Sequence, residues 1–150
     1  MSMRPVHATE GWAWARAAKR RLGDAQQPFG DPIEATDREV DLAQAVTAFA
    51  RALRSASAVR KAVQGVALPE GHDWDALESF SRRARNALEH GEERLDQPGV
   101  GYLFRREGED IVVYDKPKGA TGWSSARCSK RQLAAAVDAL EAWFELETRI

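Results

Sequence analysis

The sequence has a single cysteine and no long apolar run. Cys128 has no partner for an intramolecular disulfide and cannot supply a cysteine-rich metal site, so we expect it to be a small buried residue. No apolar stretch of the sequence approaches the roughly 20 residues that span a bilayer. Residues 1–10 also lack the apolar core of a signal peptide. We therefore expect a cytoplasmic protein without a membrane segment.

The sequence also has no excess of positive charge. Its 22 lysines and arginines are balanced by 23 aspartates and glutamates, and the formal net charge is −1. A strongly electrostatic nucleic-acid-binding domain is usually basic overall, so any contact with nucleic acid must be local. Basic residues do gather in four places, each expected to be a solvated face or loop unless several converge on one cleft. These residues are Arg16, Lys19, Arg20 and Arg21; Arg51, Arg54, Arg60 and Lys61; Arg82, Arg83 and Arg85; and Lys116 with Lys118.

Apolar residues spaced three and four apart predict a mainly helical protein. The first helix is expected over about 9–22, with Gly23 as its end. After a loop, Thr36 and Glu39 form a capping box that predicts the start of a second helix, which then runs to about residue 64. Hydrophobic residues make up 43% and charged residues 30% of the chain, which is typical of an ordinary globular protein.

Two further helices are predicted, with a change of periodicity between them. Asp73 is the expected N-cap of the third helix, and a capping box of Ser129 and Gln132 opens the fourth. The segments on either side of Glu107-Gly108 are short and rich in aromatic and β-branched residues, which predicts a β-hairpin at about 101–115. We therefore expect one domain over 1–150: a mainly α, antiparallel four-helix bundle with one β-hairpin inserted before the last helix.

The third predicted helix carries the segment Arg85-Asn86-Ala87-Leu88-Glu89-His90. Its apolar residues form a core-facing row that leaves Asn86 and His90 on the opposite side, one turn apart, with Arg85 at the edge of the row. A cation, an amide and an imidazole together can cleave RNA without a metal, because the reaction needs a base, an acid and a cation at the phosphate. Arg85, Asn86 and His90 are therefore the candidate catalytic residues. The candidate nucleic-acid-binding residues are Arg82, Arg83, Lys116 and Lys118, and no metal or cofactor is assigned.

This segment resembles the motif of HEPN-domain proteins, in which an arginine, usually followed by a polar residue, precedes a histidine by four to six intervening positions. Here four residues intervene between Arg85 and His90, and Asn86 is the polar residue. The resemblance implies a small helical protein and a homodimer in which two motifs form a composite site. It also implies a metal-independent endoribonuclease of toxin-antitoxin or antiviral-defence type that acts on single-stranded RNA.

Other interpretations of the same residues remain open. Many toxin members of the HEPN family carry a tyrosine two positions after the histidine, and Glu92 stands there in this sequence. Together with Glu89 and Glu93 it surrounds His90 with negative charge, which would repel RNA phosphates unless arginines pair with it. Arg85 and Glu89 could also form a surface ion pair, and His90 could complement the helix dipole.

Two alternative functions follow from these interpretations. The first is a catalytically inactive HEPN-like protein that binds a nucleic acid, a nucleotide or a protein partner such as a cognate antitoxin. The second is a small helical interaction module, in which the hairpin and one of two tryptophans form the contact surface. Trp12 and Trp14 lie about 200° apart on a helix, so they cannot both face the core.

Overall fold

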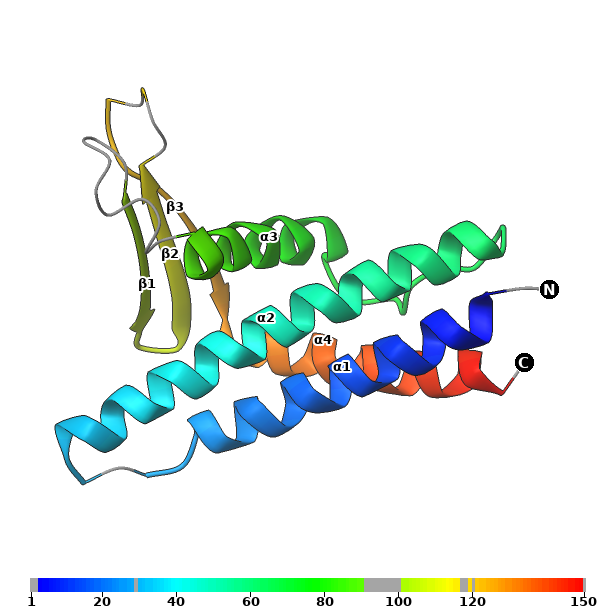
Figure 1. The fold of residues 1–150 in the computed structure, drawn as a ribbon, viewed down its shortest axis with the longest axis horizontal. Coiled ribbons are helices and arrows are strands. Elements are labelled where there is room, and N and C mark those ends of the chain that lie inside the picture. Colours follow the sequence, from blue (N-terminus) through cyan, green and yellow to red (C-terminus); the bar gives the residue numbers. More distant parts are fainter. Residues whose placement is uncertain (1–2, 29, 91–100, 117–118, 120, 150) are drawn as a thin grey trace.

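The computed structural model describes residues 3–28, 30–90, 101–116, 119 and 121–149, and for 89–90 and 101–104 it describes the backbone alone. Within these ranges the chain forms four helices and one antiparallel sheet of three strands (Figure 1). The prediction of a mainly helical fold is confirmed. In chain order the elements are α1 (Arg4–Ala25), α2 (Pro32–Ala62), α3 (Trp74–His90), β1 (Gly101–Glu107), β2 (Asp110–Lys116), β3 (Ser124–Ser129) and α4 (Lys130–Thr148).

α1 is longer at both ends than the sequence pattern indicates. It begins at Arg4, with Pro5 in the first turn, where the missing amide proton breaks no helical hydrogen bond. It ends at Ala25, so the end predicted at Gly23 is wrong. Leu22 and Ala25 on either side of this glycine are buried, and their burial outweighs the roughly 1 kcal/mol by which glycine disfavours a helix.

α2 begins one turn before the predicted capping box. The Asp31 carboxylate accepts a hydrogen bond from the Glu34 amide at 2.8 Å, and Pro32 occupies the first turn. The Thr36 hydroxyl lies inside the helix and donates to the Pro32 carbonyl at 3.0 Å, so the start predicted at Thr36 is wrong. An aspartate followed by proline is the stronger start signal here, because it supplies both a side-chain cap and a preset backbone angle. The apolar face is buried as far as Val59.

α3 begins where the sequence predicts. The Asp73 carboxylate accepts a hydrogen bond from the Ala76 amide at 3.1 Å, as expected of an N-cap. The loop before the helix is held by two indoles: Trp74 donates to the Pro69 carbonyl at 2.7 Å, and Trp143 of α4 donates to the Ala67 carbonyl at 3.0 Å. The predicted core row is buried at Leu77, Phe80, Ser81 and Ala84 and half-buried at Leu88.

The predicted hairpin is present, but it belongs to a three-stranded sheet. β1 pairs with β2 through a turn at Gly108, whose φ is 60°. β3 then pairs along the other edge of β2, and this strand was not predicted. Its sequence, SSARCS, has no β-branched or aromatic residue and buries only Cys128, so it lacks the pattern of a strand. α4 follows directly and opens with the predicted capping box of Ser129 and Gln132.

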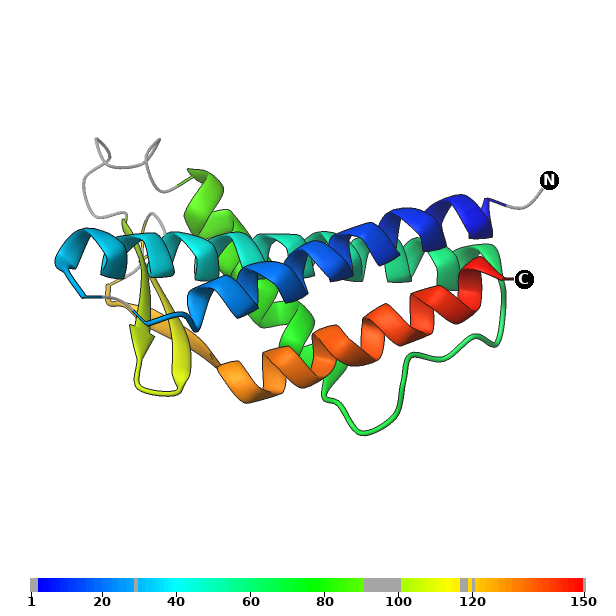
Figure 2. The same ribbon diagram turned by 90° about the horizontal axis from the view of Figure 1, so that it is seen from below.

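The helices do not all lie in one bundle. α1 packs along α2 on one side and along α4 on the other, whereas α3 packs on α2 and on all three strands (Figures 1 and 2). In Figure 2, α3 runs obliquely to α2. The molecule thus has a layer of three helices, and α3 with the sheet forms a second unit on α2. None of the described helices is both long and apolar enough to cross a membrane.

The contact between α1 and α4 depends on a glycine. A Cβ atom at Gly11 would lie 2.3 Å from the ring of Phe144, which is fully buried. The absence of a side chain therefore sets how closely the two helices approach. Near one end of the same contact, Arg4 forms an ion pair with the buried carboxylate of Glu147. Because the Glu147 carboxylate is buried, its charge is stabilised only while the Arg4 guanidinium is beside it.

Gly11→Ala should lower the free energy of unfolding by about 1–3 kcal/mol or more, because the added methyl group overlaps the Phe144 ring. Gly23→Ala in the same helix is the matched control, since a Cβ atom there meets nothing within 4 Å. The control should stabilise the protein by about 0.5–1 kcal/mol through helix propensity. Urea denaturation followed by circular dichroism measures both. Equal effects of the two substitutions would contradict the assigned packing.

Candidate functional site

Arg85, Asn86 and His90 lie in the last turns of α3, and His90 is its last residue. Buried Ala84 and Ala87 mark the core side of the helix, and Arg85 and Asn86 are half-buried beside it. The step from Arg85 to His90 turns about 140° around the helix axis, so these two residues share a helix end but not a face. The side chain of His90 falls outside what the structure describes, as does that of Glu89.

The guanidinium of Arg83 is hydrogen-bonded to the sheet. Its Nη2 and Nε donate to the Asp115 carboxylate at 2.8 and 3.3 Å, and its Nη1 donates to the Ser125 carbonyl at 3.2 Å. The Ser124 hydroxyl binds both the same guanidinium and the same carboxylate. A guanidinium group that already donates to a carboxylate on one strand and a carbonyl on another has few N–H groups left to bind a phosphate. The structure therefore gives Arg83, a predicted nucleic-acid-binding residue, a structural role between α3 and the sheet.

Arg85 lines a pocket between α2 and α3. We name this cavity of about 500 Å³ the motif pocket; its lining includes Arg54 and Ser57 of α2 and Ser81, Arg82 and Arg85 of α3. The Nε atom of Arg85 is buried and has no hydrogen-bond partner among the described residues. A buried N–H group without an acceptor is costly, and the Nε of Arg38 and the indole nitrogen of Trp12 are buried in the same way.

The motif pocket also contains acidic side chains. Asp75 and Glu78 line it on the side of α3 that comes first in the chain. Glu78 lies 3.8 Å from Arg82, and both side chains are at least half exposed, so this ion pair is weak. Arg82, a predicted nucleic-acid-binding residue, is therefore in the pocket but partly neutralised. Arg54 and Arg85 have no acidic partner in the described part of the chain.

The two predicted lysines lie near the sheet and not in the motif pocket. Lys116 is the last residue of β2 and is half-buried, one position after the Asp115 that binds Arg83. Lys118 lies outside the described residues. The same is true of Glu92 and Glu93, so the proposed influence of these carboxylates on His90 stays a prediction.

The basic residues of α2 were expected to form a solvated face, but the structure brings Arg54 to the motif pocket and Arg51 to the ring of Trp14. Arg54 lines the motif pocket, and Arg51, one turn earlier, lies over the ring of Trp14 at 4.7 Å from its centroid. Their spacing of three residues on one helix face was the available signal. What the sequence did not contain was the placement of α3 across this face.

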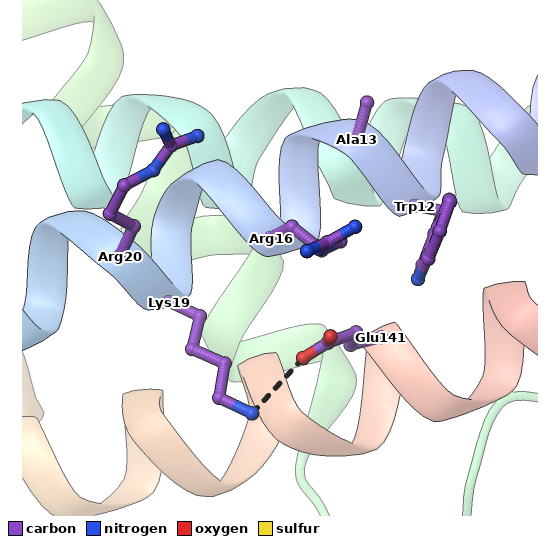
Figure 3. A pocket seen from close by; sticks show the side chains of 6 residues that line it. All are labelled: Trp12, Ala13, Arg16, Lys19, Arg20 and Glu141. Atoms are coloured by element: carbon purple, nitrogen blue, oxygen red, sulfur yellow. Dashed lines mark hydrogen bonds and ion pairs between the residues drawn. The ribbon is translucent and has the colours of Figure 1, made fainter.

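A separate pocket of about 700 Å³ lies between α1 and α4 (Figure 3). Arg16 lies 4.9 Å from the centroid of the Trp12 ring, and Lys19 reaches across to the Glu141 carboxylate at 3.2 Å. Hydrogen bonds to Glu141 and Asp138, and the charges of both, raise the pKa of Lys19. Among the described residues this pocket is lined by Arg16, Lys19 and Arg20 with the carboxylate of Glu141, and it lies away from the motif.

The described residues include no group of three or more histidine, cysteine, aspartate or glutamate side chains that could hold a metal ion. His72 packs against Trp74, with the ring centroids 5.1 Å apart. Cys128 is buried, as predicted. Burial, and then the charge of Asp110, raise the pKa of its thiol to about 11, which makes it a poor nucleophile at neutral pH.

The chain matches no known protein-family model, no curated protein sequence and no solved structure.

Asp115→Asn should destabilise the protein by roughly 1–2 kcal/mol at neutral pH, because it removes the negative charge and one of the two oxygens that accept from Arg83. Burial alone would raise the pKa of Asp115. The hydrogen bonds from Arg83 and Ser124 and the charge of Arg83 together outweigh burial, so the pKa lies below its ordinary value of 3.8. The carboxylate therefore adds stability above about pH 4 and loses it as the pH falls through the lowered pKa. Wild-type protein should lose more stability than the variant between pH 5 and pH 2. Thermal denaturation at each pH measures the difference.

Glu145→Gln is the control for this experiment, since Glu145 pairs with Arg149 at 2.9 Å but both side chains are at least half exposed. It should change stability by less than about 0.5 kcal/mol. If Asp115→Asn behaved like this control, the anchoring role of Arg83 would be wrong.

Native protein at pH 8 should resist alkylation by iodoacetamide, because the Cys128 thiol is buried and protonated at that pH. Protein unfolded in urea should take up one label, since the chain has one cysteine. Intact mass spectrometry over time gives both rates. Labelling of the native protein as fast as the unfolded protein would contradict the assigned position of Cys128.

Proposed function

We propose that the protein is a HEPN-like endoribonuclease that cleaves single-stranded RNA without a metal, as a homodimer with a composite site. The observation that carries this proposal is that Arg85 has no hydrogen-bond or ion-pair partner among the described residues and lines a pocket next to the helix end that holds Asn86 and His90. A phosphate is the natural acceptor for such a guanidinium. Because RNA is the proposed substrate, we place the protein's action in the cytoplasm, in a toxin-antitoxin or antiviral-defence system.

The separation of Arg85 and His90 favours a composite site. One chain presents them about 140° apart around the helix axis, so they approach a phosphate from different sides. A second copy related by a two-fold axis would bring the arginine of one protomer toward the histidine of the other. The helical layer and α3 would then form the HEPN-like domain, with the sheet as an addition to it.

The roles follow from the chemistry of RNA cleavage. A base takes the proton from the 2′-hydroxyl, the 2′-oxygen attacks phosphorus, and the 5′-oxygen leaves with a proton from an acid. Imidazoles titrate near neutral pH and can act in either form, which suits His90. Arg85 would bind the phosphate oxygens through its fork, and Asn86 would orient the imidazole or a phosphate oxygen.

The acidic residues of the motif pocket favour a second candidate, in which the protein binds without cleaving. Asp75 and Glu78 line the pocket, and glutamates flank His90 in the sequence. Such carboxylates repel phosphates and would suit a basic segment of a protein partner, for example a cognate antitoxin.

His90→Ala should lower the rate of cleavage of single-stranded RNA in the presence of a chelator by at least about 100-fold, because the acid and base are lost. The melting temperature should be unchanged. His72→Ala is the matched control, since this imidazole packs on Trp74 at the other end of α3 and should leave the rate unchanged. Wild-type protein that cuts no RNA would leave the binding candidate.

Mixing Arg85→Ala and His90→Ala protomers tests the composite site. If each site takes its arginine and histidine from different chains, subunit exchange should restore about a quarter of the wild-type rate, because half of the dimers regain one of two sites. Size-exclusion chromatography with light scattering checks that the protein is a dimer. A mixture as inactive as its two parents, with exchange shown by native mass spectrometry, would place each site within one chain.

A further inference from the structure

Three pockets along the outer face of α2 share lining residues. Arg54 lines both the motif pocket and a second pocket of about 280 Å³ between α1 and α2, which we name the bridging pocket. Arg51 and Trp14 line both the bridging pocket and a third one of about 480 Å³, which we name the Trp14 pocket. Leu88 of α3, two residues before His90, also lines the Trp14 pocket. A continuous surface therefore runs from Arg85 over α2 to Trp14 and returns to the end of α3.

The cations of this surface are largely unpaired. Arg51, Arg54 and Arg85 have no ion-pair partner within the described ranges, and Arg51 and Arg54 are exposed. Glu10 is the carboxylate that lines the bridging pocket, and no described residue lining the Trp14 pocket is acidic. Arg21 in the Trp14 pocket is neutralised, because it lies 3.5 Å from Asp41. The path between Trp14 and the motif therefore presents three arginines without an ion-pair partner among the described residues, with Glu10, Asp75 and Glu78 at its edges.

The Trp14 pocket offers stacking as well as charge. The Trp14 ring is half-buried, and the planar guanidinium of Arg51 lies over its face at 4.7 Å from the centroid. Tryptophan rings and arginine planes are the groups on which unpaired bases stack, and cations spaced along a groove bind the phosphates between those bases. A double helix keeps its bases paired and stacked inside, so it could not use such a platform.

We propose that this surface, which we name the α2 track, binds single-stranded RNA next to the catalytic motif. A base stacks against the Trp14–Arg51 pair, Arg54 binds an intervening phosphate, and Arg85 binds the phosphate to be cleaved. The assignment of RNA as occupant rests on the proposed function. The track adds the residues that hold the strand outside the scissile phosphate, and none of them is needed for the chemical step.

The pocket between α1 and α4, which Trp12 lines, supplies a matched comparison within the same chain. Arg16 lies over Trp12 at 4.9 Å, close to the 4.7 Å of Arg51 over Trp14. It belongs to the face of α1 that meets α4, and Glu141 lines the same pocket (Figure 3). Removing Arg16 therefore makes the same chemical change at a tryptophan that is not on the track.

The test measures binding of a 5′-fluorescein-labelled oligouridylate of 12 nucleotides by fluorescence anisotropy, in chelator, with full-length His90→Ala protein as the parent. Arg51→Gln and Arg54→Gln in this parent should each raise the Kd by about fivefold or more. Each should also make the plot of log Kd against log salt concentration less steep, by roughly the slope that one phosphate contact contributes. Trp14→Phe should weaken binding by about threefold, because a smaller ring stacks less strongly. Arg16→Gln should bind like the parent, and a labelled duplex should show no effect of Arg51→Gln.

Cleavage assays with His90 present separate the two proposals. Arg51→Gln should raise KM and leave kcat within about twofold, since the residue does not touch the reacting atoms. Cleavage that is unaffected by Arg51→Gln and Arg54→Gln would overturn the track and leave the nuclease standing. Weakened binding in these variants of a protein that never cleaves would support the track and overturn the nuclease. A parent that binds no RNA would overturn the track, as would variants that lose the dimer instead of RNA affinity, because the face would then be a contact between protomers.

Discussion

The guanidinium of Arg83 joins α3 to two strands of the sheet, and the position of the motif depends on this contact. It binds the Asp115 carboxylate at 2.8 Å and the Ser125 carbonyl at 3.2 Å, so one side chain fixes both the height and the rotation of α3 above the sheet. The first turn of the helix is held by the indole of Trp74. With both points fixed, Arg85 faces α2, and the pocket between α2 and α3 is open to a ligand. A different rotation of α3 would turn Arg85 toward the strands.

The charges of the molecule are distributed unevenly, although they nearly cancel in sum. Ion pairs connect Arg4 with Glu147, Lys19 with Asp138 and Glu141, and Arg127 with Asp110. These pairs hold elements together and use the acidic residues of α4 and the sheet. The arginines of α2 that face α3 are left without such partners among the described residues. A chain without net positive charge can therefore still present a cationic path, because the local field depends on which charges are paired.

Much of the fold could be predicted from local sequence signals. Asp73, Ser129 and Gln132 act as the predicted caps, and the turn at Gly108 lies where the hairpin was expected. The starts of α1 and α2 were missed, because prolines at their first turns extend the helices beyond the polar residues that looked like boundaries. β3 was missed because strand pairing with an open edge of β2 overrides the weak propensity of its serines.

The site could be predicted only in part, because side-chain chemistry is local whereas pockets are not. Arg85 and Asn86 were proposed from their spacing to His90, and this stays a prediction; the structure adds that Arg85 lines a pocket and that its Nε has no partner among the described residues. Arg83 was assigned to nucleic acid because it neighbours the motif, but its partner lies 32 residues away in the sequence. Arg51, Arg54 and Trp14 belong to two helices, and their relation to the motif exists only once α3 crosses α2.

The division of the molecule into a three-helix layer and a unit of α3 with the sheet affects how it opens. α3 rests on α2 and on the strands and has little contact with α1 or α4. Such a unit can detach in local fluctuations, exposing its amides to hydrogen exchange, while the layer beneath it stays closed. A strand of RNA that contacts Arg54 on one side of the boundary and Arg85 on the other would stabilise only the closed form. The cost of local opening would then rise with the free concentration of the bound strand.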